Sequence, residues 1–259
     1  MRPSKTGKST LQTPPGSGNV STTMPSGAES VLITREALED GSLLARMRAL
    51  ALPGLNLKSD VEIEASLDAM LARHPPGTDA FVFAYGSLMW NPAFHFAERR
   101  LGTIRGWHRS FCLRMPFGRG TMERPGLMMA LDSGGSCHGI AFRIPASHVR
   151  DEMLLVWRRE MAGTAYRARW LSVQTALGSI RAVTFVINRA HPRYVGKLGD
   201  SEVAEILAHA RGPLGSCAAY LQQTMQALHA LGATDHGLER LTREVARLMP
   251  AREESQSGA

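Results

Sequence analysis

The sequence predicts a single α+β domain, in which an antiparallel-type sheet or small barrel packs beside helices. Two observations support this prediction: strand-like segments are concentrated between residues 80 and 187, and helix-like segments follow after residue 200. Because strands and helices do not alternate along the chain, a doubly wound parallel sheet is not expected. The 259 residues, of which 44% are hydrophobic, are enough to form a substantial core.

The N-terminal part divides into a tail and a helical segment. Residues 1–30 are rich in Ser, Thr, Gly and Pro without apolar periodicity, so we expect a disordered tail. A helical segment is expected over residues 31–76. Within it, Thr34 is suited to cap a short helix that Gly41 interrupts, and Asp60 is suited to cap a second helix over residues 61–73.

Six segments are strand candidates. The run 80–85 is short and almost wholly apolar, and it stops at Gly86-Ser87, which is typical of a buried strand. Turn signals such as Ser133-Gly134-Gly135 separate most of the others. These other candidates are residues 107–114, 127–131, 138–144, 169–175 and 180–187.

Four helices complete the main predicted domain, which spans residues 77–250. One interrupts the strands, and three follow Pro192, with stop signals at Gly212-Pro213 and Gly232. Their expected ranges are 147–161, 201–210, 216–231 and 235–248. Residues 251–259 are expected to be a flexible C-terminal tail.

The charge balance is positive, with 30 Lys and Arg residues against 23 Asp and Glu residues and a formal net charge of +7. Such a surplus permits a nucleic-acid partner, so one interpretation is a basic nucleic-acid-binding domain without catalytic activity. The arginines are scattered, however, and the four tyrosines are too few for an obvious surface on which bases stack. No apolar run reaches about 18 residues. We therefore expect neither a nucleic-acid nor a membrane partner.

The three cysteines, Cys112, Cys137 and Cys217, are widely spaced and form no Cys-x-x-Cys pair. This spacing indicates neither a disulfide framework nor a zinc site. Structural or incidental thiols of this kind suit a reducing compartment, so we expect a cytoplasmic protein.

Common catalytic signatures are missing from the sequence, including the P-loop, GxGxxG, HExxH and GxSxG. The loop Tyr85-Gly86-Ser87-Leu88 after the buried strand is a better candidate. Its glycine allows a ligand to approach the backbone, and successive amides in such a turn can bind an anion. An ordinary strand-to-loop turn is the alternative interpretation.

Glu160 is the candidate for acid–base chemistry. On a helix, it falls within an apolar face whose other members are Val149, Met153, Val156 and Trp157. Burial of a carboxyl group raises its pKa toward the range that a general acid or base needs. The structural alternative is an ion pair at the helix end.

The neighbouring charges bear on that alternative. Arg158 and Arg159 are expected to project away from Glu160, while Arg119 and Arg143 are the arginines expected to be able to reach it. Glu152 and Arg159 lie on the edge of the predicted helix, so both are expected to be solvated. The segment Gly118-Arg119-Gly120-Thr121 is expected to form a flexible loop between two strands.

Several segments form a combined pattern, which runs from about residue 78 to residue 248 in order. They are residues 83–92 (FAYGSLMWNP), 106–109 (GWHR), 118–121 (GRGT), 125–126 (PG), 157–161 (WRREM) and 212–215 (GPLG). The pattern resembles the ChaC family of glutathione-specific γ-glutamylcyclotransferases. The Tyr-Gly-Ser-Leu loop is shared with γ-glutamylcyclotransferases generally, whereas Trp-Arg-Arg-Glu and Gly-Arg-Gly-Thr are typical of the ChaC branch.

The resemblance implies a small mixed barrel with flanking helices and a lyase that converts glutathione into 5-oxoproline and cysteinylglycine. It also implies that neither a metal nor an organic cofactor is needed. We expect Glu160 to be the acid–base residue. The expected substrate-binding residues are Phe83, Ala84, Tyr85, Gly86, Ser87 and Leu88 in the loop, Tyr220 as a pocket wall, and Arg119 at the glycine carboxylate of glutathione.

Cyclisation of a γ-glutamyl group can be catalysed by a single carboxylate that acts first as a base and then as an acid. The α-amine of the γ-glutamyl group attacks its own γ-carbonyl, so the enzyme gains mainly by holding the attacking conformer. The amine must lose a proton and the leaving amine must gain one, and one residue with a raised pKa can do both. A cyclotransferase acting on γ-glutamyl amino acids or another γ-glutamyl metabolite is the alternative enzyme.

Overall fold

The computed structural model describes residues 33–49 and 55–249. Its centre is a closed barrel of five strands. They are β1 (Ala80–Ala84), β2 (Glu98–Met115), β3 (Gly126–Ile144), β4 (Tyr166–Thr175) and β5 (Gly178–Ile187). In the order β1-β3-β2-β4-β5 all neighbours are antiparallel, and β5 closes the barrel through parallel pairs with β1 and β3. The expected α+β fold with a small mixed barrel is confirmed.

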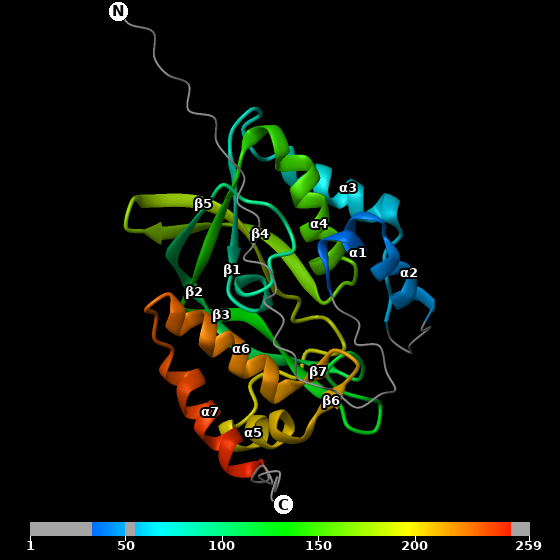
Figure 1. The fold of residues 1–259 in the computed structure, drawn as a ribbon, viewed down its shortest axis with the longest axis vertical. Coiled ribbons are helices and arrows are strands. Elements are labelled where there is room, and N and C mark those ends of the chain that lie inside the picture. Colours follow the sequence, from blue (N-terminus) through cyan, green and yellow to red (C-terminus); the bar gives the residue numbers. More distant parts are fainter. Residues whose placement is uncertain (1–32, 50–54, 250–259) are drawn as a thin grey trace, which may run out of the picture.

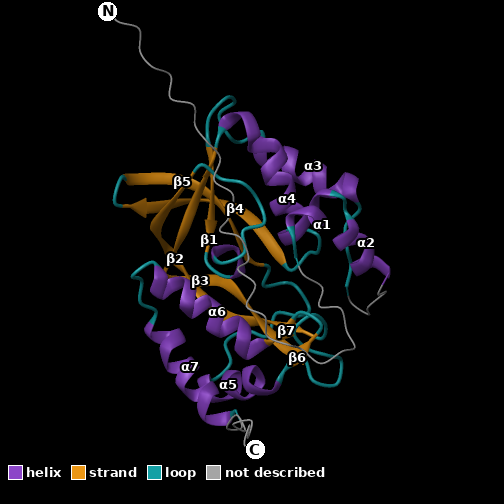
Figure 2. Ribbon diagram, viewed as in Figure 1, coloured by secondary structure: helices purple, strands orange, loops and turns teal. Residues whose placement is uncertain are grey.

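Helices cover the barrel from two sides (Figure 1). One group contains α1 (Arg35–Glu39), α2 (Ser42–Ala49), α3 (Asp60–Leu71) and α4 (Val149–Glu160), and the other contains α5 (Asp200–His209), α6 (Cys217–Ala230) and α7 (His236–Leu248). Figure 2 shows the strands enclosed between the two groups. The short elements are η1 (Ser87–Met89), η2 (Ala146–His148), β6 (Arg211–Gly212) and β7 (Gly215–Ser216).

The predicted tails, residues 1–30 and 251–259, lie outside the described residues. The described part of the predicted segment 31–76 is helical and shares one hydrophobic cluster with the barrel. Across residues 33–49 and 55–249, no helix is both long enough and apolar enough to cross a membrane.

Side chains cap several of the helices. Thr34 is the cap of α1, as expected, and accepts a hydrogen bond from the Ala37 amide, and Ser216 and Asp235 cap α6 and α7 in the same way. The cap of α3 is Ser59 instead of the predicted Asp60, because Ser59 and Glu62 form a reciprocal capping box. Helix α2 lies within the segment that was expected to be helical, but it was not assigned a range of its own.

The segment Ser133-Gly134-Gly135 is not the predicted turn, because β3 continues through it. Gly134 and Gly135, with φ of 103° and 68°, lie opposite Gly106, where the register of β2 and β3 shifts. Two residues facing one is the arrangement of a β-bulge, in which glycine tolerates the positive φ. Strand β2 also begins at Glu98, nine residues before the predicted start, because its first half pairs with the extended β3.

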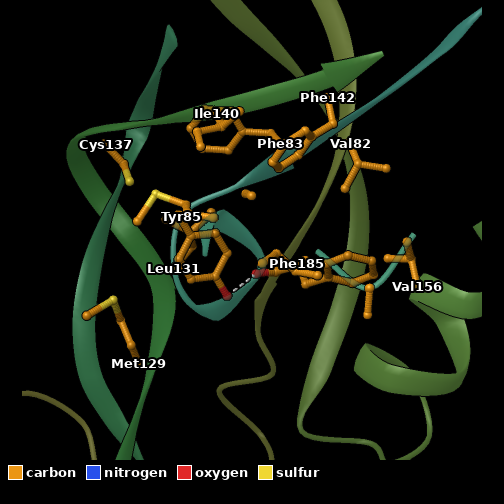
Figure 3. Packing of buried hydrophobic residues seen from close by; sticks show 14 of the residues in the cluster. Val82, Phe83, Tyr85, Met129, Leu131, Cys137, Ile140, Phe142, Val156 and Phe185 are labelled. Atoms are coloured by element: carbon orange, nitrogen blue, oxygen red, sulfur yellow. Dashed lines mark hydrogen bonds between the residues drawn. The ribbon is translucent and has the colours of Figure 1, made fainter. Parts of the chain in front are cut away.

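Strand β1 is buried on both faces and positions the loop that follows it. Gly139 of β3 allows the strands to approach closely, since a Cβ there would lie 2.2 Å from the Ala84 carbonyl oxygen. Figure 3 shows Tyr85 pointing toward Phe185 of β5, and the Tyr85 hydroxyl donates a hydrogen bond of 2.8 Å to the Phe185 carbonyl. Trp157 of α4 packs edge-on against the Phe185 ring, so the helix is held against the barrel at this point.

All three cysteines are buried, and none forms a disulfide. Cys112 and Cys137 lie on β2 and β3, and Cys217 begins α6. They are therefore part of the packed interior, as the interpretation of structural thiols anticipated.

Candidate active site

A pocket of about 190 Å³ opens where β1 leads into η1 and where α4 ends. Much of its wall is apolar and includes Leu113, Met115, Met128, Met129 and Leu214. Seven polar or charged side chains share this wall: Tyr85, Ser87, Arg159, Glu160, Tyr166, Arg193 and Tyr220. An apolar cavity with a few convergent polar groups is the usual form of a small-molecule site.

The predicted loop Tyr85-Gly86-Ser87-Leu88 forms one side of the pocket. The turn is closed by the Met89 amide, which donates to the Gly86 carbonyl at 2.9 Å. Tyr220 of α6 packs directly on Gly86, since a Cβ at position 86 would lie only 2.8 Å from the Tyr220 hydroxyl oxygen. Glycine is therefore needed here for the close approach of a side chain to the backbone.

Glu160 is the last residue of α4, and its carboxylate lies in the pocket wall with 16% of the side chain exposed. The predicted apolar face of the helix is present, with Val149, Met153, Val156 and Trp157 all buried. Burial raises the pKa of Glu160 above its ordinary value of 4.5, while the Arg159 guanidinium acts in the opposite direction. The group is thus a carboxyl that holds its proton more tightly than one in water.

Arg159 does not project away from Glu160, as expected, but pairs with it. The Arg159 Nε lies 3.0 Å from Glu160 Oε1, and the Arg159 side chain is only 4% exposed. The same guanidinium donates to Ser87 Oγ at 2.8 Å and to the Asn91 carbonyl oxygen. Since α4 ends at Glu160, both side chains turn toward the loop after β1. One buried cation therefore connects the candidate base to the loop.

The expectation of a solvated Glu152 is also wrong. Its carboxylate is 4% exposed and receives two hydrogen bonds from Arg35 of α1, at 2.6 and 3.0 Å. The His95 amide donates a third, at 2.8 Å. The physical reason is the packing of α1 on α4, which brings a partner from 117 positions away in the sequence.

The remaining predicted residues fall into two groups. Leu88 and Tyr220 line the pocket, whereas Phe83 and Ala84 are fully buried in the core behind the loop and are not among the lining residues. Arg119 is also outside the lining; it donates to the Ser216 carbonyl at 3.0 Å, and its guanidinium lies 5.1 Å from the centre of the Tyr220 ring.

Neither arginine expected to reach Glu160 pairs with it among the described residues. Arg143 forms ion pairs with Asp79 and Glu98, and Arg119 is held by Ser216. The Arg119 segment connects β2 and β3, as expected of a loop between two strands, and its backbone is closely packed. A Cβ at Gly120 would lie 2.2 Å from the Gly126 amide nitrogen, and one at Gly212 of β6 would lie 2.3 Å from the Gly118 carbonyl oxygen.

Besides Arg159, which was expected to be solvated, sequence reasoning did not identify two other polar residues of the pocket, Tyr166 and Arg193. The Tyr166 hydroxyl donates to the Met129 carbonyl at 3.0 Å, and Arg193 lies between Met115 and Phe117. Neither residue belongs to a recognisable motif, and only the folding of β2, β3 and β4 brings them to the pocket. In the described part of the chain, no three His, Cys, Asp or Glu side chains gather in a way that could hold a metal ion.

The chain is similar to several known proteins. The family model of ChaC-like proteins matches residues 80–248. The glutathione-specific gamma-glutamylcyclotransferase of Escherichia coli (strain K12) is 42% identical over 186 residues, which cover 71% of this chain and 80% of that protein. The glutathione-specific gamma-glutamylcyclotransferase 1 of Homo sapiens is 27% identical over 177 residues, covering 66% and 80%.

A solved structure shows the same fold. The crystal structure of the γ-glutamyl cyclotransferase specific to glutathione from yeast, in selenomethionine-labelled form, superposes with a TM-score of 0.62 at 20% identity. The match covers 66% of this chain and 97% of the yeast chain.

Proposed function

Because the chain belongs to the ChaC family, we propose that it cleaves the γ-glutamyl bond of glutathione and releases 5-oxoproline and cysteinylglycine. The observation that carries this proposal is a buried carboxyl, Glu160, in the wall of a pocket that also contains the Tyr85-Gly86-Ser87-Leu88 loop. The two groups are joined through Arg159, so an acid–base residue and a binding loop face the same space.

The reaction is an intramolecular cyclisation. The α-amine nitrogen of the γ-glutamyl group forms a bond to the γ-carbonyl carbon and closes a five-membered lactam. At neutral pH this amine is largely protonated, so a base must take a proton before the nitrogen can attack. Glu160 is the base in this proposal, and its raised pKa makes it a better proton acceptor than an ordinary carboxylate.

The second half of the reaction needs a proton. The bond between the γ-carbonyl carbon and the cysteine nitrogen breaks, and the leaving amine requires protonation as it departs. Glu160 now carries the proton that it took from the attacking amine, and it gives that proton to the leaving nitrogen. The ring nitrogen still holds one proton more than the neutral lactam, and the regenerated carboxylate passes this second proton to the departing amine, so cysteinylglycine leaves as an ammonium ion. No water is consumed, and the carboxylate is regenerated.

The loop after β1 has the complementary role of holding the substrate. Its backbone amides bind the α-carboxylate and stabilise the oxyanion that forms on the γ-carbonyl oxygen. Arg159 supports this role because it holds Ser87 Oγ and Glu160 together. Tyr220 forms the opposite wall against Gly86. The attacking amine, the carbonyl and the base are thereby brought into one geometry, which supplies much of the rate of such a reaction.

The test is Glu160→Gln, which keeps the shape of the side chain and removes the titrating group. With the purified full chain and glutathione, we expect the release of 5-oxoproline to fall by about 10²- to 10⁴-fold. Asp151→Asn is the matched control, because it removes one negative charge from an exposed position on the same helix. Near-normal turnover by Glu160→Gln would remove this residue from the mechanism.

The same assay distinguishes the alternative enzyme. We expect glutathione to be turned over with a higher kcat/KM than γ-glutamylalanine. The reverse preference would indicate a cyclotransferase for γ-glutamyl amino acids. No 5-oxoproline from either compound would refute the proposed function.

We place the reaction in the cytoplasm. The three cysteines are buried and unpaired, as is usual in a reducing compartment. A fluorescent fusion that located the protein outside the cytoplasm would contradict this assignment.

A further inference from the structure

We propose that Arg193 binds the glycine carboxylate of glutathione and thereby makes the tripeptide a better substrate than γ-glutamyl dipeptides. This inference rests on the proposed function and extends it to the other end of the substrate. It also moves the role expected of Arg119 to a different arginine, since Arg119 donates to Ser216 and lies outside the pocket lining.

Arg193 is a pocket-lining cation without an anionic partner. Among the described residues no carboxylate lies within ion-pair distance of its guanidinium, and its Nε is buried without a hydrogen-bond partner. The guanidinium instead contacts a thioether and an aromatic ring. Nη1 lies 3.4 Å from Met115 Sδ, and the guanidinium carbon lies 4.8 Å from the centre of the Phe117 ring. Arg193 is half-buried and its Nε is shielded from solvent, and a cation in such a position is costly unless an anion pairs with it, so this position favours an anionic ligand.

The backbone around Arg193 is fixed on the barrel. The Arg114 amide donates to the Arg193 carbonyl at 2.9 Å, and Tyr194 forms an isolated bridge with Leu113 of β2. The Arg193 amide donates to His191 Nδ1 at 3.1 Å. The guanidinium is therefore presented from a positioned segment, as a site of defined geometry requires.

The position of Tyr166 relates Arg193 to Glu160. Burial first raises the pKa of Tyr166, the charge of Glu160 raises it further, and the charge of Arg193 lowers it. Both charges thus lie near enough to the Tyr166 hydroxyl to act on it, and all three side chains line the same pocket.

Glutathione is long enough to contact two separate polar groups of one pocket. The cysteine and glycine residues that follow the γ-carbonyl span about 7 Å when extended. A carboxylate that far from the reacting carbonyl can contact Arg193 in the wall of the same pocket while the γ-glutamyl group is held next to Glu160. In a γ-glutamyl amino acid the carboxylate is one residue closer to the carbonyl, so it cannot make the same contact.

A planar guanidinium is well matched to a carboxylate, because it can donate two parallel hydrogen bonds. The guanidinium carbon lies over the Phe117 ring, a contact that uses the face of the group and none of its N–H donors. Binding through this contact strengthens substrate affinity at a distance from the chemistry, so its effect is expected in KM more than in kcat.

The experiment combines a change in the enzyme with a change in the substrate. Arg193→Gln removes the charge, and glutathione esterified at the glycine carboxylate removes its proposed partner. For the wild-type full chain, we expect esterification to lower kcat/KM by about 10- to 100-fold, the value of a charge-assisted hydrogen bond. For Arg193→Gln, we expect a similar loss with glutathione and no further loss with the ester. Turnover of γ-glutamylalanine should be almost unchanged by the variant.

Arg114→Gln is the matched control, because Arg114 lies beside Arg193, is exposed, and does not line the pocket. It should retain the wild-type preference for the free acid over the ester. Arg193→Lys, which keeps the charge but not the planar fork, should recover part of the preference. If Arg193→Gln does not fold, as judged by thermal unfolding, Arg193→Lys and the wild-type comparison of acid and ester still decide the question.

Two results would overturn the inference. The first is equal turnover of the free acid and the ester by the wild type. The second is an unchanged preference for the free acid in Arg193→Gln, or in Arg193→Lys if Arg193→Gln does not fold. Either result is distinguishable from failure of the proposed function, in which the wild type releases no 5-oxoproline from any γ-glutamyl compound.

Discussion

Gly86→Ala tests whether the pocket depends on the close approach of Tyr220 to the loop. The added Cβ would lie 2.8 Å from the Tyr220 hydroxyl oxygen. To restore an ordinary contact of 3.4 Å, one of the two groups must move by about 0.6 Å. Tyr220 cannot move freely, because it is 2% exposed and packs against the rings of Trp90 and Phe111.

The expected magnitude follows from this overlap. Overpacking of a filled interior costs about 1–3 kcal/mol of unfolding free energy. A displaced loop also misplaces the γ-glutamyl group, so we expect kcat/KM for glutathione to fall by about 10- to 100-fold. Both quantities are measurable on one preparation, by urea denaturation and by release of 5-oxoproline.

A double-mutant cycle isolates the contact. Tyr220→Phe removes the oxygen in question and alone should cost about 0.5–1.5 kcal/mol. The next atom of Tyr220 lies 4.0 Å from the added Cβ, so Gly86→Ala should add little in the Tyr220→Phe background. The expected coupling between the two substitutions is about 1–3 kcal/mol.

The control is Gly163→Ala, which places the same methyl group in the pocket wall with no atom within 4 Å. It should be close to neutral in stability. The reasoning would be refuted if Gly86→Ala behaved like Gly163→Ala, or if the effects of Gly86→Ala and Tyr220→Phe simply added.

Two further predictions concern buried carboxylates. Glu152→Gln should lower the free energy of unfolding by about 2–4 kcal/mol, less than a fully buried ion pair would, because Arg35 is 23% exposed; a change below about 0.5 kcal/mol in urea denaturation would contradict this. In a pH profile of kcat/KM, activity should be lost as pH falls through the raised pKa of Glu160, so the acid limb should lie above the ordinary carboxyl value of 4.5, and a limb at or below that value would contradict the assignment. The linkage has the opposite sign for stability: Glu160 binds a proton more tightly in the folded state, so its contribution to stability is lost as pH rises through that pKa.

The sequence correctly predicted features that depend on residues close together in the chain, such as a buried strand and the buried face of a helix. The apolar run of β1 identified a buried strand, and helical periodicity placed Glu160 on the same face as Trp157. The Gly-Arg-Gly-Thr segment was identified as a motif, but its tight packing was not, because that depends on the β6–β7 hairpin about 90 residues later in the chain.

Interactions across the chain explain the errors. Glu152 seemed solvated because its partner, Arg35, is 117 positions away, and the pairing of Arg159 with the loop after β1 spans 72 positions. The glycines at 134 and 135 gave the same signal as a turn, and only the opposing Gly106 makes them a bulge. Periodicity describes one element at a time, so it could not show which distant element would supply a counter-charge or a strand partner.

The buried cysteines have a consequence for an enzyme whose proposed substrate is a thiol. Mixed disulfides form only through the thiolate of the attacking cysteine. Burial raises the pKa of Cys112 to about 12 and that of Cys137 to about 11, and it raises that of Cys217 as well. At neutral pH the three thiols are therefore held in their protonated form, which is the less reactive one. Thiol exchange with oxidised glutathione is thus suppressed in all three cysteines, and the catalyst is protected from covalent modification by the redox state of the pool that it consumes.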